Sequence, residues 1–208
     1  MLVSESRGFL FVHVQKTAGT SLTRLLEPWA LQPDAGRWNR LLSDAGLQRD
    51  WRQAFYRKHA PLRVAEKRLP AEHFESLFKF AFVRNPWDRM ASWHRYVLAT
   101  PSHHLYRRTK AGDFDAFLQR MARRLQRSQW CMLVDSKGRM RLDFVGRFER
   151  LHDDVREVAR RLQLPKLELA PAAAAPRDYR SLYSEAGAEL VAKAFATEIE
   201  YFGYRFDP

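Results

Sequence analysis

Residues 9–21 read FLFVHVQKTAGTS, an apolar run followed at once by small and polar residues. The run at 9–14 predicts a buried strand, and residues 16–21 predict a loop that opens a helix. N–H groups at a helix N-terminus, together with the positive end of the helix dipole, form a site for an anion. Lys16 adds a mobile positive charge, and Gly19 lets the backbone approach a ligand closely. The segment therefore predicts a phosphate-binding loop.

The order of residues in this loop differs from that of the common nucleotide-binding loop. A Walker loop reads Gly-x-x-x-x-Gly-Lys-Ser/Thr, with its lysine after the last glycine. Here Lys16 comes before Gly19, and no second glycine stands upstream in the loop. A kinase or ATPase of the ordinary type is therefore disfavoured.

A second segment follows another apolar run of strand length. Residues 78–83 predict a buried strand, and residues 84–92, RNPWDRMAS, come directly after it. Asn85 is a favourable N-cap and Pro86 suits the first helical position, so we expect a helix over about 86–98.

Arg84 and Ser92 are spaced to act on one ligand. Arg84 would stand at the strand end, and Ser92 would lie about two turns into the helix, roughly 10 Å along its axis. A long guanidinium can close that distance, so the two side chains could grip one phosphate. The spacing leaves open a salt bridge between Arg84 and Asp88 instead.

The rest of the pattern indicates an α/β protein. It predicts a strand over 143–148, helices over about 20–26, 38–45, 49–55, 70–77, 115–125, 151–162 and 184–201, a basic loop over 102–112, and a loop rich in proline and alanine over 165–176. Strands separated by helices favour a P-loop-like fold of three layers, with a central, mainly parallel sheet flanked by helices. The 208 residues show no linker, so we expect one domain over 1–208.

Composition narrows the class of partner and the cell compartment. Lys and Arg number 36 against 24 Asp and Glu, a net charge of +12, which favours an anionic partner without choosing among nucleotide, acidic glycan, nucleic acid and membrane surface. Cys131 is the only cysteine, which excludes an intrachain disulfide and a cysteine-based metal cluster. No apolar run approaches the roughly 20 residues of a membrane span, and no secretory leader is evident. We expect a cytoplasmic protein without a metal.

The two segments together resemble the sulfotransferases that use 3′-phosphoadenosine 5′-phosphosulfate (PAPS). The resemblance is to the carbohydrate-type, heparan 2-O-sulfotransferase-like branch, through Lys-Thr-Ala-Gly-Thr-Ser at 16–21 and Arg-Asn-Pro-x-Asp-Arg at 84–89. Gln15 stands where the family often has proline. The resemblance implies transfer of a sulfuryl group to a hydroxyl of a carbohydrate or small molecule, with adenosine 3′,5′-bisphosphate as product. Animal relatives are commonly anchored in the Golgi membrane, so the missing anchor suggests a bacterial enzyme.

The resemblance also implies a donor site. Lys16 would contact the phosphosulfate and offset charge on the leaving oxygen, and the 5′-phosphate would be cradled by Thr17, Ala18, Gly19, Thr20 and Ser21. Arg84 and Ser92 would hold the 3′-phosphate. Weaker matches place Gln129 near the adenosine and Arg177 or Arg180 over the nucleotide, although a solvated basic loop explains the last two equally well. Arg147 could also approach the nucleotide.

Transfer to a hydroxyl requires a base that removes the acceptor proton, and a histidine with a pKa near 6.5 suits neutral pH. His59, in Lys58-His59-Ala60, matches the family's Lys-His-Ala segment and is the implied base. His103 and His104 are rival candidates, and His13 has a structural explanation on the strand that enters the loop.

Two other functions stay open. A nucleotide kinase or other phosphoryl transferase could use the same strand-loop-helix unit, and it would depend on a metal ion. A nucleic-acid-binding protein could use the positive charge, but the basic residues are spread along the chain and no RNA-binding signature occurs, so we expect no nucleic-acid partner. The acceptor, which could be a glycan, and the oligomeric state are not predicted.

Overall fold

The computed structural model describes residues 1–123, 128–165, 167, 169 and 178–207. The chain forms two compact units. Met1–Val83 with Met132–Ala174 is called the sheet unit, and Arg84–Cys131 with Ala175–Pro208 is called the helical unit. One functional domain over 1–208 stays a prediction.

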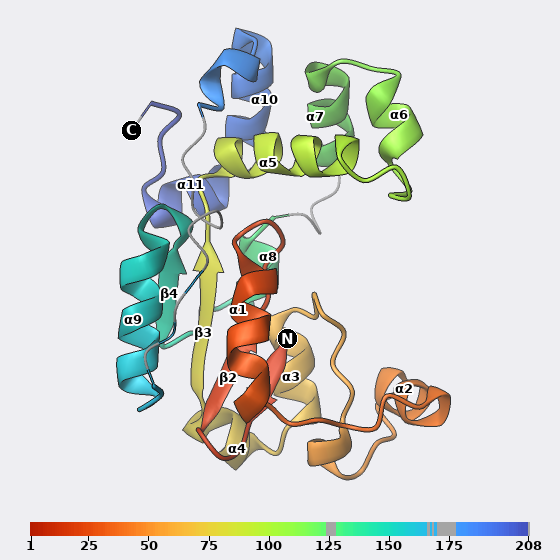
Figure 1. Cartoon of the computed structure of the whole chain (residues 1–208), viewed down its shortest axis with the longest axis vertical. Helices are drawn as coiled ribbons and strands as arrows, with labels where there is room; N and C mark the ends of the chain where they lie inside the picture. The colour runs from red at the N-terminus through yellow and green to blue at the C-terminus, as the bar shows by residue number, and fades with distance from the viewer. Residues whose placement is uncertain (124–127, 166, 168, 170–177, 208) are drawn as a thin grey trace. The chain divides into compact units, whose positions relative to one another are not determined.

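The sheet unit contains a four-stranded sheet in the order β1-β2-β3-β4 (Figure 1). Its strands are β1 (Leu2–Ser4), β2 (Phe9–Val12), β3 (Phe78–Val83) and β4 (Phe144–Arg147). β2, β3 and β4 are parallel, and β1 pairs antiparallel with β2 at the edge. The prediction of an α/β fold around a mainly parallel sheet is confirmed.

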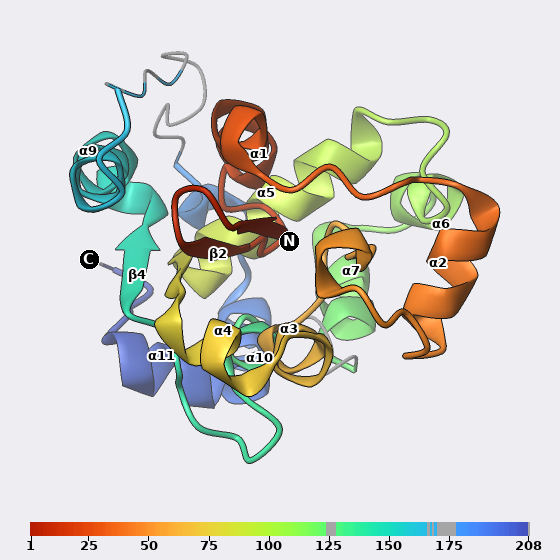
Figure 2. The same ribbon diagram turned by 90° about the horizontal axis from the view of Figure 1, so that it is seen from below.

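Helices cover both faces of this sheet, as the strand-helix alternation predicts. In Figure 2, α1 (Gly19–Leu26) and α9 (Leu151–Arg161) lie on one face, and α3 (Leu62–Arg68) and α4 (Ala71–Ser76) lie on the other. α1 and α9 bury their apolar sides in one core with the aromatic side chains of the strands, among them Phe9, Phe11, Phe80 and Phe82. Burial of this apolar area is the main force that holds the layers together.

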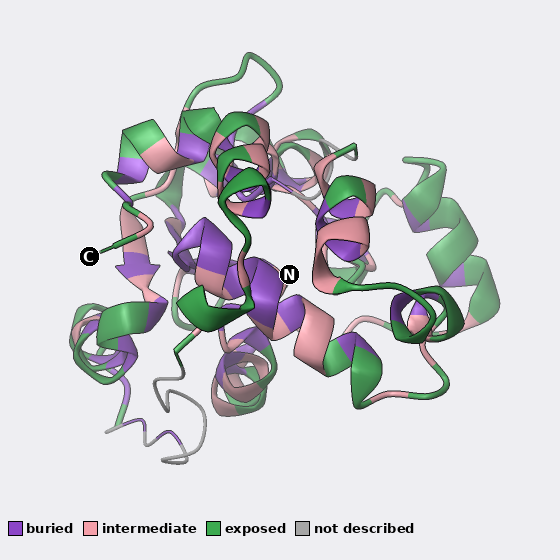
Figure 3. Ribbon diagram, turned by 90° about the horizontal axis from the view of Figure 1, so that it is seen from above, coloured by how far each residue is buried: buried purple, intermediate pink, exposed green. Residues whose placement is uncertain are grey.

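The remaining elements of the sheet unit are short. They are η1 (Glu27–Trp29), α2 (Arg37–Asp44), η2 (Trp51–Gln53) and η4 (Phe148–Arg150). α2 is exposed over most of its surface (Figure 3). The helix predicted at 38–45 is present as α2, whereas the one predicted at 49–55 is reduced to the single 3-10 turn η2.

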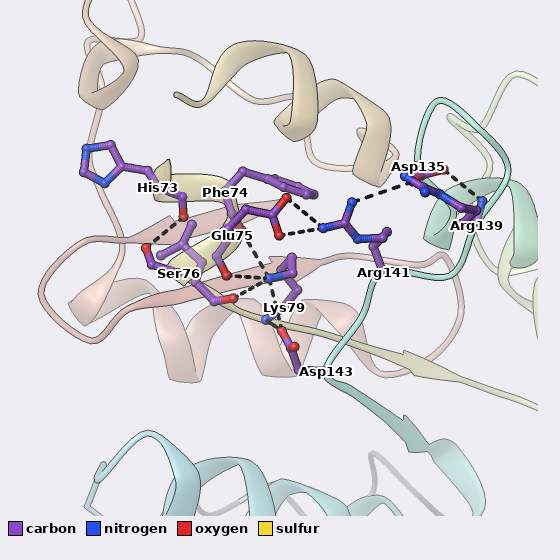
Figure 4. Close-up of polar contacts among 10 residues, drawn as sticks. His73, Phe74, Glu75, Ser76, Lys79, Asp135, Arg139, Arg141 and Asp143 are labelled. Atoms are coloured by element: carbon purple, nitrogen blue, oxygen red, sulfur yellow. Dashed lines mark hydrogen bonds and ion pairs between the residues drawn. The ribbon is translucent and has the colours of Figure 1, made fainter. Parts of the chain in front are cut away.

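A lysine on β3 is accommodated by a polar cluster at the amino end of the strand (Figure 4). The Lys79 ammonium is buried and donates to three carbonyls at the end of α4, those of Phe74, Glu75 and Leu77, at 3.2, 3.3 and 2.7 Å. It also pairs with Asp143 at 3.3 Å, just before β4. A buried charge is costly unless it is paired and hydrogen-bonded, and here both conditions hold. The cluster therefore ties α4, β3 and β4 together at the edge opposite the strand carboxyl ends.

The helical unit is built around α5 (Pro86–Leu98), which is buried along most of its length (Figure 3). Its other elements are α6 (Tyr106–Lys110), α7 (Phe114–Ala122), η6 (Arg180–Leu182), α10 (Glu185–Ala194) and α11 (Ala196–Phe202), and α8 (Trp130–Leu133) spans the boundary of the two units. The Asn85 side chain accepts a hydrogen bond from the Trp87 N–H at 3.1 Å, so the predicted N-cap and helix bounds are confirmed.

Three predictions of secondary structure need correction. The basic stretch at 102–112 contains α6 and is not entirely a loop. The single helix predicted over 184–201 is two helices separated at Phe195, and Gly203, with φ 64°, ends the second. β1, α3 and α8 were not predicted. Most of the predicted loop at 165–176, and Arg177, lie outside the described residues. Within the described residues, none of the helices has the length and apolar character needed to cross a bilayer.

Candidate functional site

The carboxyl ends of the three parallel strands define one edge of the sheet. β2 ends at Val12, β3 at Val83 and β4 at Arg147, and their register places these ends together. In open α/β sheets, ligands bind outside the carboxyl ends of the strands. The loop at 16–21 follows β2 within the sheet unit, so this predicted binding segment begins where the rule expects a ligand.

The loop at 16–21 has an unusual backbone. Lys16 and Ala18 have φ values of 68° and 60°, in the left-handed region that residues with a side chain rarely adopt. Such conformations cluster at ligand-binding sites. α1 begins at Gly19 with Ala18 as N-cap, one residue before the predicted start at about 20. Within the described chain no side chain caps this helix, and its first turn holds no acidic residue, which leaves first-turn N–H groups for an anion.

Gly19 is required by its neighbour within the protein. A Cβ at this position would lie 2.1 Å from the Cδ2 and Nε2 atoms of the His13 ring. The sequence predicts that this glycine allows close approach of a ligand, and that stays a prediction; the structure adds a reason within the protein, because α1 packs directly on the imidazole.

The hydroxyl residues of the loop differ in what they can offer a ligand. Thr17 is buried, and its hydroxyl donates to the Val14 carbonyl at 3.1 Å, so it stabilises the loop. What Thr17 can offer an anion is its backbone N–H. Thr20 is exposed, and Ser21 and Lys16 are half-buried.

His59 is held in one tautomer by the strand that enters the loop. Its Nδ1 lies 3.0 Å from the His13 carbonyl oxygen. Because a carbonyl only accepts, Nδ1 carries the proton and Nε2 carries the lone pair. Burial lowers the pKa of His59 below 6.5, against the opposing effect of this hydrogen bond, and the nearby Lys58 charge lowers it further. At neutral pH the ring is therefore a neutral imidazole that can accept a proton.

His13 connects His59 with α1. The two rings meet edge to face with centroids 4.6 Å apart, and His13 Nδ1 lies 3.2 Å from Thr23 Oγ1 on α1. Burial is the main cause that lowers the pKa of His13 to about 2, and electrostatic repulsion by the neighbouring His59 is the second. His13 is thus a neutral structural residue, as predicted, although it lies just after the end of β2 and not within the strand. It contacts both the loop and the candidate base.

In the helical unit, Arg84 is buried, and Asp88 and Gln129 are among its partners. Its Nε donates to Asp88 Oδ2 at 2.7 Å, so the salt bridge that its spacing left open is formed. The Gln129 side chain accepts from the Arg84 N–H and donates to the Arg84 carbonyl, both at 2.9 Å. Gln129 therefore fixes the backbone of Arg84, a role that the sequence did not reveal.

Ser92 lies four residues beyond Asp88 on α5 and therefore shares its face of the helix. Arg95, three residues further on, is 3.8 Å from Asp88 Oδ1. This stripe brings two guanidinium groups and one hydroxyl to a single side of α5. Arg95 had no assigned role in the sequence interpretation, although its spacing from Ser92 is a usable signal.

A buried carboxylate organises the segment that carries Gln129. Glu198 on α11 pairs with Arg89 at 3.3 Å, and both side chains are fully buried. One oxygen of Glu198 also accepts hydrogen bonds from three consecutive residues, Ser128, Gln129 and Trp130, at 2.7, 2.5 and 3.2 Å. Glu198 thereby holds Gln129 in place, and Gln129 in turn holds Arg84.

The other predicted residues have structural partners. His103 and His104 stack on each other at the start of the α6 region, and His103 Nδ1 accepts the Leu105 N–H at 3.1 Å. Arg147 ends β4, and its N–H donates to Asp154 at 2.6 Å. Arg180 pairs with Asp178 at 3.1 Å.

One cation at the loop was overlooked. The Lys58 ammonium lies 3.2 Å from Thr20 Oγ1. The sequence signal for it is the Lys-His-Ala segment, in which Lys58 directly precedes His59.

Comparison with known protein families gives a match over nearly the whole chain. The family model described as Sulfotransferase family matches residues 1–204 of the 208. No curated protein and no solved structure matches this chain.

Proposed function

We propose that this chain, which belongs to the sulfotransferase family, transfers a sulfuryl group from PAPS to a hydroxyl of a carbohydrate or small-molecule acceptor. The observation that carries the proposal is the position of His13 in the sheet unit. This residue contacts the anion loop at Gly19 and holds the candidate base, His59, by its carbonyl. His13 therefore contacts both the N-terminus of α1, where an anion would bind, and the neutral imidazole of His59.

The sheet unit would bind the sulfur end of the donor. The loop offers the N–H groups of an uncapped helix start, the Lys16 ammonium and the hydroxyls of Thr20 and Ser21. These groups suit a phosphosulfate, since fixed N–H donors and cations stabilise charge that develops on a leaving oxygen. Lys16 would carry most of that stabilisation as a mobile point charge.

The helical unit would bind the 3′-phosphate. Arg84 and Ser92 are the residues that the family resemblance assigns to this group, and Arg84 is held in place by Asp88 and Gln129. A guanidinium can donate to a phosphate through paired hydrogen bonds. The 3′-phosphate distinguishes this donor from ordinary adenine nucleotides, so Arg84 would set donor specificity.

His59 would act as the general base. When PAPS is bound it supplies a sulfuryl group whose bond to the phosphate oxygen breaks as a new S–O bond to the acceptor oxygen forms. His59 Nε2 accepts the acceptor's hydroxyl proton during that step, while Nδ1 keeps its hydrogen bond to the His13 carbonyl. The imidazolium that results is stabilised by that same hydrogen bond.

The test is turnover of PAPS by the full chain with a panel of sugar, glycan and small-molecule alcohols, measured as adenosine 3′,5′-bisphosphate released. Lys16→Ala and His59→Ala should each lower turnover by about 100-fold or more. Circular dichroism of both variants should match the parent protein. Full turnover by both variants would contradict the assigned roles, and release of ADP from ATP that a chelator abolishes would favour a metal-dependent phosphoryl transferase.

A further inference from the structure

Lys58 reaches the anion loop from a different part of the chain. Its ammonium is 3.2 Å from the hydroxyl of Thr20, the second residue of α1, and both side chains are exposed. An ammonium has N–H donors and no acceptor, so the oxygen of Thr20 accepts in this contact. The hydroxyl proton of Thr20 is then directed elsewhere and can be donated to a ligand.

The backbone that carries Lys58 is tied to the loop by its neighbours. The Ala60 N–H donates to the Arg57 carbonyl at 3.0 Å, which closes a turn around Lys58 and His59. His59 reaches the His13 carbonyl at the end of β2, and Lys58 reaches Thr20 at the start of α1. Two adjacent side chains thus contact two points on the same strand-loop-helix segment.

The charge of Lys58 adds to a site that already favours anions. The first turn of α1 holds no acidic residue, and Lys16 stands on the other side of Gly19 in the loop. The Lys58 ammonium, which lies beside the second residue of α1, raises the positive potential where a phosphate would sit. Lys58 also helps keep His59 uncharged, because it lowers the pKa of that ring.

We propose that Lys58 is a donor-binding residue that contacts the 5′ end of the nucleotide and orients the Thr20 hydroxyl toward it. This inference rests on the proposed function, because it requires a nucleotide at the loop. It separates the roles within the Lys-His-Ala segment: Lys58 binds the donor, and His59 handles the acceptor proton.

The experiment uses calorimetric titration of the full chain with two nucleotides. Adenosine 3′,5′-bisphosphate has a phosphate at the 5′ end, and adenosine 3′-monophosphate has none. Lys58→Met should weaken binding of the bisphosphate by about 5- to 20-fold, as expected for one lost charge-assisted contact at an exposed site, and should leave the monophosphate unchanged. Lys58→Arg should keep most of the affinity. Lys67→Met, at an exposed lysine of α3, is the matched control and should change neither titration.

The outcomes separate the two proposals. If the parent protein does not bind the bisphosphate, the proposed function fails and this inference fails with it. If the parent binds it and Lys58→Met binds equally well, the role of Lys58 is wrong while the proposed function stands. Equal weakening for both nucleotides would mean that Lys58 acts only on the structure of the loop, and this also overturns the inference.

Discussion

Replacing Glu198 by glutamine should strongly destabilise the protein. Both Glu198 and Arg89 are fully buried, so the substitution leaves a guanidinium without its counter-charge. Breaking a buried pair in this way costs about 3–5 kcal/mol. The glutamine also turns an N–H₂ group toward donors that now share one carboxylate oxygen, those of residues 128–130.

Urea denaturation followed by circular dichroism gives the free energy of unfolding, and a thermal scan should show a melting temperature about 6–20 °C lower for a chain of this size. Glu200→Gln, at an exposed position of the same helix, is the matched control and should stay within about 0.5 kcal/mol of the parent. A loss below about 1 kcal/mol for Glu198→Gln would refute this reasoning.

Three further predictions concern the sheet unit. Gly19→Ala forces a Cβ into the His13 ring, so it should lower the free energy of unfolding, measured by urea denaturation, by about 1–3 kcal/mol. No measurable loss would show that α1 can shift away from the ring. As the pH is lowered, kcat/KM should fall with an apparent pKa below 6.5, because burial lowers the pKa of His59 and the neutral ring is the active form. An apparent pKa above 6.5 in this pH profile would contradict the prediction. Because the folded-state pKa of His13 is lowered to about 2, its contribution to stability is present above pH 6.5 and is lost as the pH falls, by about 1.4 kcal/mol between pH 7.5 and 5.5. His13→Gln should remove that part of the pH dependence of unfolding, and an unchanged slope would count against it.

The elements nearest the predicted site could be read from the sequence because strong local signals mark them. β3 and α5 have the predicted bounds, since an apolar run meets Asn85 and Pro86, which stop a strand and start a helix. α6 lacks such signals: it is five residues long within a basic stretch. β1 has three residues, too few to show alternation, and it depends on pairing with β2. The break at Phe195 leaves the apolar spacing intact, so periodicity predicts one helix across it.

The candidate site was predictable as a set of residues, whereas the contacts among them were not. The sequence identifies Lys16, Gly19, Arg84 and His59 as chemically meaningful. It does not show that Gly19 packs on an imidazole, because that contact depends on how α1 leaves the loop. The partners of Glu198 are 68 to 109 residues away in the chain, beyond the reach of any local pattern.

The central claim is that the chain binds a nucleotide with phosphates at both ends, and calorimetric titration tests it most directly. Adenosine 3′,5′-bisphosphate should bind at least about tenfold more tightly than adenosine 5′-monophosphate, a difference of about 1.4 kcal/mol for the 3′-phosphate. Arg84→Gln should abolish that preference, and Arg107→Gln, at an exposed arginine of α6, should preserve it. Equal affinity of the parent protein for the two nucleotides, or no binding of the bisphosphate, would contradict the account.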